Sequence, residues 1–448
     1  MDRQKKRQLM EMALSYGLDK GAAACDLIWQ DGQSFTLSAH GGGIDKYKVA
    51  GSRVLGVRTI REEKIGLAST EAATEEAIKI MVDDALQNSA FAGTDPLQTI
   101  TVENSDDLIE DGEKICRPDT TPAKNKIDLA LDLEKKIMEA DSKVVACPHN
   151  GYSDNVSEHL YLNHLGTFCA HRERVFSCYT SALFKDGSHQ SMHHKSSVSR
   201  EFAGLNPAEC VEESLEIGRG LLHGKPVPTA RMDVIFDIEV WQSLLNCFLG
   251  LFSAKTAMEG KNSFKDKLGE TIAHPAFSLR DAPMYTDGFQ HISFDDEGMK
   301  KAELELVEGG VLRNFLHNSI TAAFFGTRST AHAARSARTP MGVSGSQFVI
   351  RPGEDAEDGL KSGRWLQVVQ LQGLHSGTNA ISGDFSLGAT GFLHSDGARR
   401  PVREVTVSGN FFDLIRNIAG IGDRLHSSGS RSFFSPLIRF SDLSIAGS

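Results

Sequence analysis

The stretch CDLIWQDGQSFTLS, residues 25–38, carries the alternation of apolar and polar side chains that is typical of a half-buried β-strand. Its centre is Asp31-Gly32, a dipeptide that favours tight turns because both positions tolerate positive φ. The pattern therefore predicts two antiparallel strands, Cys25–Gln30 and Ser34–Ser38, joined by a hairpin at Asp31-Gly32.

The segments on either side of this stretch extend the same module. A helix is expected over Gln4–Tyr16, and further strands over Arg53–Ile60 and Lys64–Ser69. Thr70 or Thr74 can then cap a helix that runs to about Asn88. Residues 1–92 are thus predicted to form an N-terminal α-β-β-β-β-α module with an antiparallel sheet.

Three further segments follow this module. Residues 93–122 are acidic and interrupted by prolines, so we interpret them as a linker with at most one short helix. Residues 123–224 are expected to form a middle α/β domain, and residues 225–448 a strand-rich C-terminal domain. The predicted fold class is therefore α+β.

Several elements of these two domains can be placed from local patterns. The middle domain is expected to contain two helices flanking a set of strands, and the C-terminal domain one long helix capped by Asp237 and two hairpins. The expected helices are Lys126–Ala140, Pro207–Leu222 and Glu239–Glu259, and the expected hairpin turns are Asp186-Gly187, Glu308-Gly309-Gly310 and Asp396-Gly397.

Composition narrows the class of protein. The chain has 448 residues with 40% hydrophobic and 24% charged side chains, which is ordinary for a globular protein. No apolar run approaches the roughly 18 residues of a membrane span, and no secretory signal is recognisable, so we expect a cytoplasmic protein. The net charge of −11 argues against nonspecific binding to nucleic acid, and the seven scattered cysteines are expected to be reduced thiols.

Local motifs for hydrolysis are missing or incomplete. No His-Glu dipeptide of a zinc helix occurs, and Gly342-Val343-Ser344-Gly345-Ser346 misses the last glycine of a serine-hydrolase elbow. The histidine cluster His189-Gln190-Ser191-Met192-His193-His194 could ligate a metal, but a solvated strand face without a nearby carboxylate is favoured. Asp295-Asp296-Glu297-Gly298 is interpreted as an exposed turn, since it lacks the ligand spacing of a calcium loop.

A set of short motifs, taken in order along nearly the whole chain, resembles the TldD/PmbA family and within it the PmbA branch, also called TldE. Leu162-Asn163-His164-Leu165-Gly166 is similar to the family's Asn-Ser-x-Gly, although His164 replaces a small residue. The other motifs are Leu55-Gly56-Val57-Arg58, Lys64–Thr70, Phe294-Asp295-Asp296-Glu297-Gly298, Gly383–Phe392, Val407-Ser408-Gly409-Asn410 and Leu443–Gly447.

This resemblance implies a cytosolic peptidase made of two related chains. The TldD branch binds zinc through a His-Glu-x-x-x-His helix and a later cysteine, and the PmbA branch pairs with it without these ligands. In this chain the corresponding helix is expected over Glu239–Glu259 and contains no histidine; its polar positions include Ser243, Asn246 and Cys247. The segment His426–Ser432, where the zinc branch has its cysteine, contains no thiol. We therefore expect no metal and no catalytic residue in this chain, and zinc in the partner chain.

The resemblance also implies substrates that are extended, poorly folded peptides, as in maturation of a peptide antibiotic and degradation of an antitoxin. The leading hypothesis is a noncatalytic subunit whose TldD-like partner cuts such peptides. A second hypothesis is a homodimeric peptide-binding protein without hydrolysis, and a third is hydrolysis by this chain through Cys247 or Ser386. The family name "modulator of DNA gyrase" gains no support from the charge of the chain.

Candidate residues for a peptide groove come from polar positions beside turn glycines in the last segment. These are His375, Asp384 and Ser386. A turn in which Asp384 accepts backbone hydrogen bonds explains the same pattern without any ligand.

Overall fold

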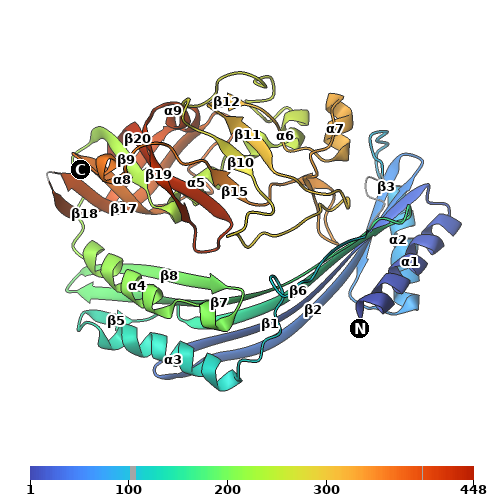
Figure 1. Cartoon of the computed structure of the whole chain (residues 1–448), viewed down its shortest axis with the longest axis horizontal. Coiled ribbons are helices and arrows are strands. Elements are labelled where there is room, and N and C mark those ends of the chain that lie inside the picture. Colours follow the sequence, from blue (N-terminus) through green and yellow to red (C-terminus); the bar gives the residue numbers. More distant parts are fainter. Residues whose placement is uncertain (101–106, 396, 448) are drawn as a thin grey trace.

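A computed structural model describes residues 1–100, 107–395 and 397–447. A long, curved sheet runs beneath a second, strand-rich body formed by the C-terminal half of the chain (Figure 1). Eight of the described strands form the long sheet in the order β3-β2-β1-β6-β7-β4, with β5 and β8 also paired to β7. They are β1 (Ala24–His40), β2 (Gly43–Arg61), β3 (Lys64–Thr70), β4 (Leu108–Glu110), β5 (Val144–Ala146), β6 (Gly151–Asn163), β7 (Phe168–Asp186) and β8 (His189–Ser199).

The expected hairpin at Asp31-Gly32 is wrong, because β1 passes straight through this dipeptide. Asp31 lies opposite Arg53 of β2 on one side and Glu158 of β6 on the other. Strands on both sides of β1 satisfy its backbone groups along its length, and this outweighs a local turn preference. The chain instead turns at Gly41-Gly42, both of which have positive φ. The first module therefore has the order α-β-β-β-α, with three strands rather than the predicted four.

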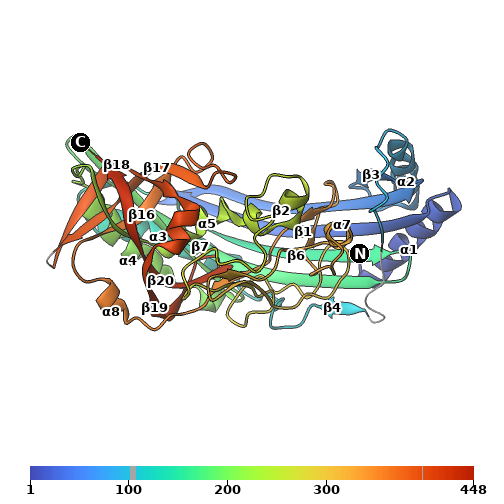
Figure 2. The same cartoon turned by 90° about the horizontal axis from the view of Figure 1, so that it is seen from above.

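Helices cover the two ends of the long sheet. Figures 1 and 2 place α1 (Arg3–Asp19) and α2 (Glu75–Ser89) at one end and α3 (Ala123–Glu139) and α4 (Pro207–Leu221) at the other. All four helices were predicted, and the Thr74 hydroxyl accepts the capping hydrogen bond from the Ala77 N–H at 3.3 Å. A short 3₁₀ helix, η1 (Phe202–Gly204), precedes α4.

The predicted linker contributes a strand to the sheet rather than a helix. β4 pairs in parallel with Cys169–His171 of β7. Strands from residues 1–92 and from residues 123–224 therefore share one sheet, and the expected hairpin at Asp186-Gly187 joins β7 to β8.

The C-terminal body contains a second sheet of ten described strands. β9 pairs with both β16 and β20, so that β20, β18, β17, β16 and β9 close into a ring around an apolar core. The strands are β9 (Ala230–Phe236), β10 (Leu279–Asp281), β11 (Leu304–Glu308), β12 (Val311–Leu312), β15 (Phe348–Ile350), β16 (Trp365–Gln372), β17 (Asp384–Ser395), β18 (Ala398–Asn410), β19 (Ile418–Ser427) and β20 (Phe433–Ala446).

Smaller elements complete this body. Both expected hairpin pairings are present, β11 with β12 and β17 with β18, although Asp396 of the second turn lies outside the described residues. A separate two-stranded ladder and several short helices connect the strands. They are β13 (Ala333–Ala334), β14 (Gly342–Val343), α5 (Ile238–Asn246), η2 (Leu249–Phe252), α6 (Ala254–Met258), α7 (Ser319–Phe325), α8 (Glu357–Leu360) and α9 (Phe411–Arg416).

The long helix expected over Glu239–Glu259 is broken into α5, η2 and α6. The Asn262 amide donates to carbonyl oxygens in the interrupted stretch, to Leu251 at 3.0 Å and to Ser253 at 3.2 Å. Carbonyls that a continuous helix would satisfy internally thus find a side-chain partner. Asp237 does stand at the N-cap of α5, but its side chain makes no capping bond.

A buried ion cluster joins the two bodies. The carboxylate of Asp26 on β1 is fully buried and lies 2.6 Å from Arg58 Nη2 of β2 and 2.6 Å from Arg335 Nη2 of the C-terminal half. The Tyr161 hydroxyl donates to the same carboxylate at 3.3 Å. A buried carboxylate is stable only when it is paired and hydrogen-bonded, so the cluster requires the C-terminal half to sit at this point of the sheet.

The acidic motif Asp295-Asp296-Glu297 is not an exposed turn. Asp295 and Glu297 are only 2% and 4% exposed. The Asp295 carboxylate accepts N–H groups of Met299 and Ala333, and burial together with the nearby Glu297 raises its pKa. The motif therefore binds the first residue of α7 through Glu297, and Ala333 beyond α7 through Asp295, rather than facing solvent.

No helix among the described residues is both long and apolar enough to cross a membrane.

Replacing Arg335 by methionine should destabilise the protein, because it leaves the buried Asp26 with one cation instead of two. We expect a loss of about 3 kcal/mol in the free energy of unfolding, measured by urea titration. The matched control is Arg338→Met, since Arg338 is 57% exposed and pairs with the 72% exposed Glu71. Its expected change is below about 1 kcal/mol, and equal small losses for the two variants would contradict the assigned role.

Candidate functional site

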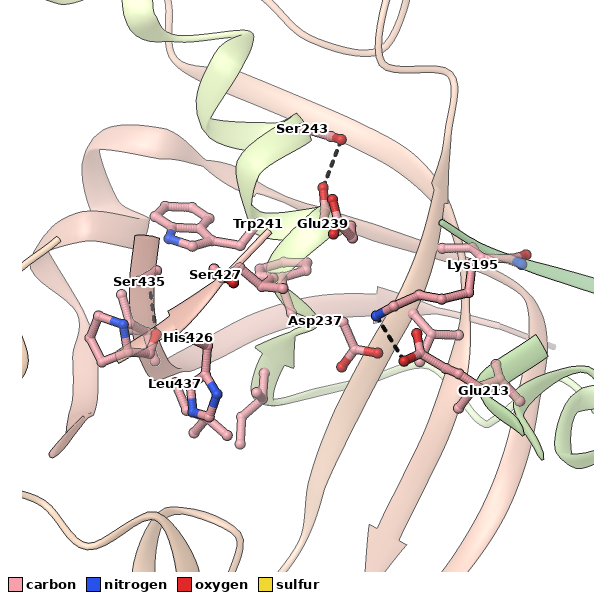
Figure 3. A pocket seen from close by; sticks show the side chains of 18 of the residues that line it. Lys195, Glu213, Asp237, Glu239, Trp241, Ser243, His426, Ser427, Ser435 and Leu437 are labelled. Atoms are coloured by element: carbon pink, nitrogen blue, oxygen red, sulfur yellow. Dashed lines mark hydrogen bonds and ion pairs between the residues drawn. The ribbon is translucent and has the colours of Figure 1, made fainter. Parts of the chain in front are cut away.

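The candidate site is a cavity of about 970 Å³ between the long sheet and the C-terminal body. Figure 3 shows side chains from both bodies converging on it. β8 and α4 line one wall, and α5, β19 and β20 line the other. A cleft between two bodies with convergent polar groups is the usual location of a ligand site.

The first turn of α5 presents polar side chains to this cavity. The helix is amphipathic: Trp241, Leu244 and Leu245 are buried in the core, with the Trp241 ring centre 4.9 Å from that of Phe440. Glu239 and Ser243 line the cavity one turn apart, and the Ser243 hydroxyl donates to the Glu239 carbonyl at 2.7 Å.

The segment 426–432 lies directly against α5, although about 190 residues separate them. The Gly429 N–H donates to Glu239 Oε1 at 2.5 Å, and the Gln242 amide donates to Ser432 Oγ at 3.1 Å. The two segments that the resemblance assigns to the two parts of the zinc site of a TldD chain are thus neighbours in this structure.

Most charged groups of the cavity are paired with each other. Lys195 Nζ lies 2.8 Å from Glu213, and His426 Nε2 lies 2.5 Å from Glu357, which also pairs with Lys361 at 3.3 Å. Burial alone would raise the pKa of Glu213, but hydrogen bonds from His193 and Lys195 lower it below its ordinary value. The Lys195–Glu213 pair is therefore a preformed ion pair at neutral pH.

Asp237 differs from these paired groups. The apolar strand β9 carries it to the start of α5, where the Gln367 amide donates to its Oδ1 at 2.9 Å. Burial, with a smaller contribution from Glu213, raises its pKa to about 6. No cation lies within ion-pair distance of it in the described part of the chain. The pKa of Asp237 therefore lies closer to neutrality than that of an ordinary aspartate.

The cavity does not fit a zinc ion. Tetrahedral zinc needs three or four histidine, cysteine or carboxylate ligands converging within about 2.3 Å. Within residues 1–100, 107–395 and 397–447 no group of three or more such side chains is arranged to hold a metal. The Glu239 carboxylate accepts a hydrogen bond from the Gly429 N–H, and His426 contacts Glu357 rather than converging with Glu239 on a common point. What the cavity offers is a set of hydrogen-bonding groups.

The two sets of candidate residues proposed from the sequence, those on the zinc-helix equivalent and those of the peptide groove, lie in different parts of the structure. Ser243 lines the cavity, Asn246 is exposed further along α5, and the Cys247 thiol donates to the Ser243 carbonyl at 3.4 Å. His375, Asp384 and Ser386 lie elsewhere, exposed on β17 and the loop before it. Asp384 accepts the Asn410 amide at 2.9 Å, and no groove residue of this set lines the cavity.

His193 was misjudged from the sequence. His193 and His194 both line the cavity, but His193 is only 13% exposed, whereas His194 is exposed as expected. The expected lack of a nearby carboxylate is wrong as well, because α4 packs across β8 and brings Glu213 to 3.6 Å from His193. Burial, with the neighbouring His193 and His149, lowers the pKa of His194. A contact between distant elements of this kind leaves no local signal in the sequence.

Removing the ionisable group at Asp237 should change how stability depends on pH. Because the folded-state pKa of about 6 exceeds the unfolded value of about 3.8, Asp237 stabilises the fold below pH 4 and loses this contribution as the pH rises through 6. Between pH 4 and pH 7.5 the wild type should therefore lose about 2 kcal/mol of unfolding free energy relative to Asp237→Asn. Calorimetry at several pH values measures this difference.

The control for this measurement is Asp266→Asn, because the Asp266 side chain is 85% exposed. This variant should follow the wild-type pH profile. Parallel profiles for the wild type and Asp237→Asn would show that Asp237 is ionised normally in the fold.

Comparison with known proteins places the chain in a family. Family models described as PmbA/TldA metallopeptidase domain 1, central domain and C-terminal domain match residues 25–89, 116–222 and 229–447. The metalloprotease PmbA of Escherichia coli O157:H7 is 23% identical, covering 99% of this chain and 97% of its own. A metalloprotease of Methanothermobacter thermautotrophicus is 29% identical, covering 68% of each chain.

Solved structures agree with this assignment. A Thermotoga maritima protein named as a candidate modulator of a DNA gyrase superposes with a TM-score of 0.84 at 25% identity, covering 98% of this chain and all of its own. TldE of Thermococcus kodakarensis superposes with a TM-score of 0.82 at 20% identity and the same coverage. Because the family models match most of its length, the chain belongs to the PmbA/TldD family of metallopeptidases.

Proposed function

We propose that this chain is the non-zinc-binding subunit of a two-chain PmbA/TldD-type metallopeptidase in the cytoplasm that processes or degrades unfolded peptides. The observation that carries the proposal is the contact between α5 and the segment 426–432. The two segments that would carry the zinc ligands in a TldD chain contact each other here. The groups that they bring together are a carboxylate, amides and hydroxyls.

The family's zinc helix can be compared with α5 residue by residue. Placing His-Glu-x-x-x-His over α5 with its glutamate at Glu239 leaves Ile238 and Ser243 at the two histidine positions. Neither an isoleucine nor a serine side chain is a zinc ligand of structural or catalytic sites. This placement supports a chain that keeps the shape of the site and relies on a partner for the metal.

The cavity supports a role in holding peptide. Its walls offer preformed ion pairs and hydrogen-bonding groups on both sides, from Lys195 and Glu213 to Glu357 and His426. Such groups can bind a polar main chain without cutting it. Two relatives carry the name metalloprotease, and one solved relative is a TldE protein, which is consistent with a peptidase subunit of this branch.

Mixing experiments test the proposal. The full chain is combined with a zinc-bearing TldD-like chain, and cleavage of an unstructured fluorogenic peptide is followed for each chain alone and for the mixture. We expect cleavage only in the mixture, complete loss with a zinc chelator, and loss when the glutamate of the partner's zinc helix is changed to glutamine. Full cleavage by the partner alone would refute the subunit role.

The same experiment separates the other hypotheses. A stable homodimer of this chain that binds peptide and gives no cleavage in any mixture would support the homodimeric peptide-binding protein. Chelator-resistant cleavage by this chain alone, lost in Cys247→Ala or Ser386→Ala, would support hydrolysis by the chain itself.

A further inference from the structure

One side of the long sheet ends in an unpaired length of strand β2. β2 pairs with β1 from Gly43 to Ile60, but β3 covers it only from Leu55 onward. In the described part of the chain, residues 43–54 thus have a neighbouring strand on one side only. Figure 2 shows β2 along this side of the sheet. We call this segment the β2 edge.

Apolar side chains are exposed along the β2 edge. Tyr47 is 53% and Val49 is 73% exposed, and nearly every residue from 43 to 53 faces solvent. Exposed edge strands can pair with any extended chain, and proteins usually shorten them, interrupt them with proline or a bulge, or place charged side chains, especially lysine, along them. This edge is long and contains no proline.

The pairing of β1 shows which backbone groups of the β2 edge are free. The His164 N–H donates to the Cys25 carbonyl at 3.0 Å, so the backbone of Cys25 faces β6. Because alternate residues face opposite sides, the even-numbered residues of β1 face β2, and Thr36 exchanges hydrogen bonds with Lys48. The N–H and C=O groups of Tyr47 and Val49 therefore point outward to the free side.

Two lysines give the β2 edge a local positive charge. Lys46 and Lys48 lie on the same face of the strand, opposite the neutral Ser38 and Thr36 of β1. Neither makes an ion pair with an acidic side chain that the structure describes. Counting Asp45 and Arg53 as well, residues 43–54 carry a net positive charge in a chain of net charge −11, and this strip attracts carboxylates.

We propose that the β2 edge binds an extended acidic peptide segment as an added strand. Main-chain hydrogen bonds form to Tyr47 and Val49, acidic side chains at alternate positions face Lys46 and Lys48, and apolar side chains between them pack on Tyr47 and Val49. The inference rests on the proposed function, since it names the class of unfolded substrate that this subunit would hold. It places a peptide site on the N-terminal sheet, away from the cavity beside α5.

A second copy of the chain fits this edge less well. Antiparallel pairing of two copies centred on residue 46, 47 or 48 sets lysines of the two strands directly opposite each other, which is destabilising. Pairing of one strand edge alone also buries far less than the roughly 1,200 Å² of a stable protein interface. Both arguments favour a peptide with complementary charge.

Binding of a labelled peptide to the chain without any partner tests the inference. The probe is an acetylated heptapeptide, Glu-Val-Glu-Thr-Glu-Val-Glu, measured by fluorescence anisotropy at low salt. Two matched peptides are compared with it, one with lysine in place of each glutamate and one with alternate amides N-methylated. We expect at least tenfold weaker binding of both, because the first reverses the charge and the second removes main-chain donors.

Protein variants locate the site. Val49→Pro removes an outward N–H without touching the bonds to β1, and Lys46→Glu combined with Lys48→Glu reverses the charge. Each should weaken binding at least tenfold, whereas Ile80→Glu on the exposed face of α2 should leave it unchanged; equal melting temperatures establish that the variants fold. Equal binding of the N-methylated peptide, unchanged binding by Val49→Pro, or self-association of the chain that Val49→Pro abolishes would each overturn the inference.

The outcome does not depend on cleavage. Binding at the β2 edge together with full cleavage by a TldD-like chain alone would refute the subunit role and leave this inference standing. Partner-dependent cleavage without binding at the β2 edge would support the subunit role and refute this inference.

Discussion

The salt bridge between Asp26 and Arg335 is the interaction on which the arrangement of the molecule depends. It joins the first residues of β1, a central strand of the long sheet, to the C-terminal body, with Arg58 as a second cation on the same carboxylate. A carboxylate buried this deeply costs several kcal/mol when a partner is lost. The backbone approaches closely beside it, since a Cβ on Gly56 would lie 1.9 Å from the Ala337 carbonyl oxygen. Sheet and body are therefore fixed against each other at this point.

A second set of contacts lies toward the other end of the sheet and shapes the cavity. The Gln370 amide of β16 donates to the Met192 carbonyl of β8 at 2.9 Å. With both ends held, α5 faces β8 and α4 across the cavity, and side chains far apart in sequence come together there. Lys195 and Glu213 are paired within one wall of the cavity, and Glu357 and His426 are paired within the other.

Much of the fold could be predicted from local patterns, because helices and hairpins are specified by nearby residues. The Thr74 cap, the apolar spacing of α1 and the glycine turn between β11 and β12 are examples. The hairpin predicted at Asp31-Gly32 was wrong because the strands on both sides of β1 determine the path of the backbone there. The identity of the two residues does not reveal these neighbouring strands. The exposed turn predicted at Asp295 and Glu297 was wrong for a related reason. Their carboxylates accept backbone N–H groups from segments more than twenty residues away as well as from their own turn. Among the residues that line the cavity, Ser243 was singled out from the sequence. The proximity of His193 and Glu213 could not be predicted, because it depends on helix α4 packing across strand β8.

The central claim is that this chain retains the architecture of the family's metal site and leaves the metal to a partner. Native mass spectrometry of the chain alone and of its complex with a TldD-like chain, both purified with zinc present, measures this most directly. The account predicts no zinc on this chain by itself and one zinc in the two-chain complex, carried by the partner. One equivalent of tightly bound zinc on the isolated chain would contradict it.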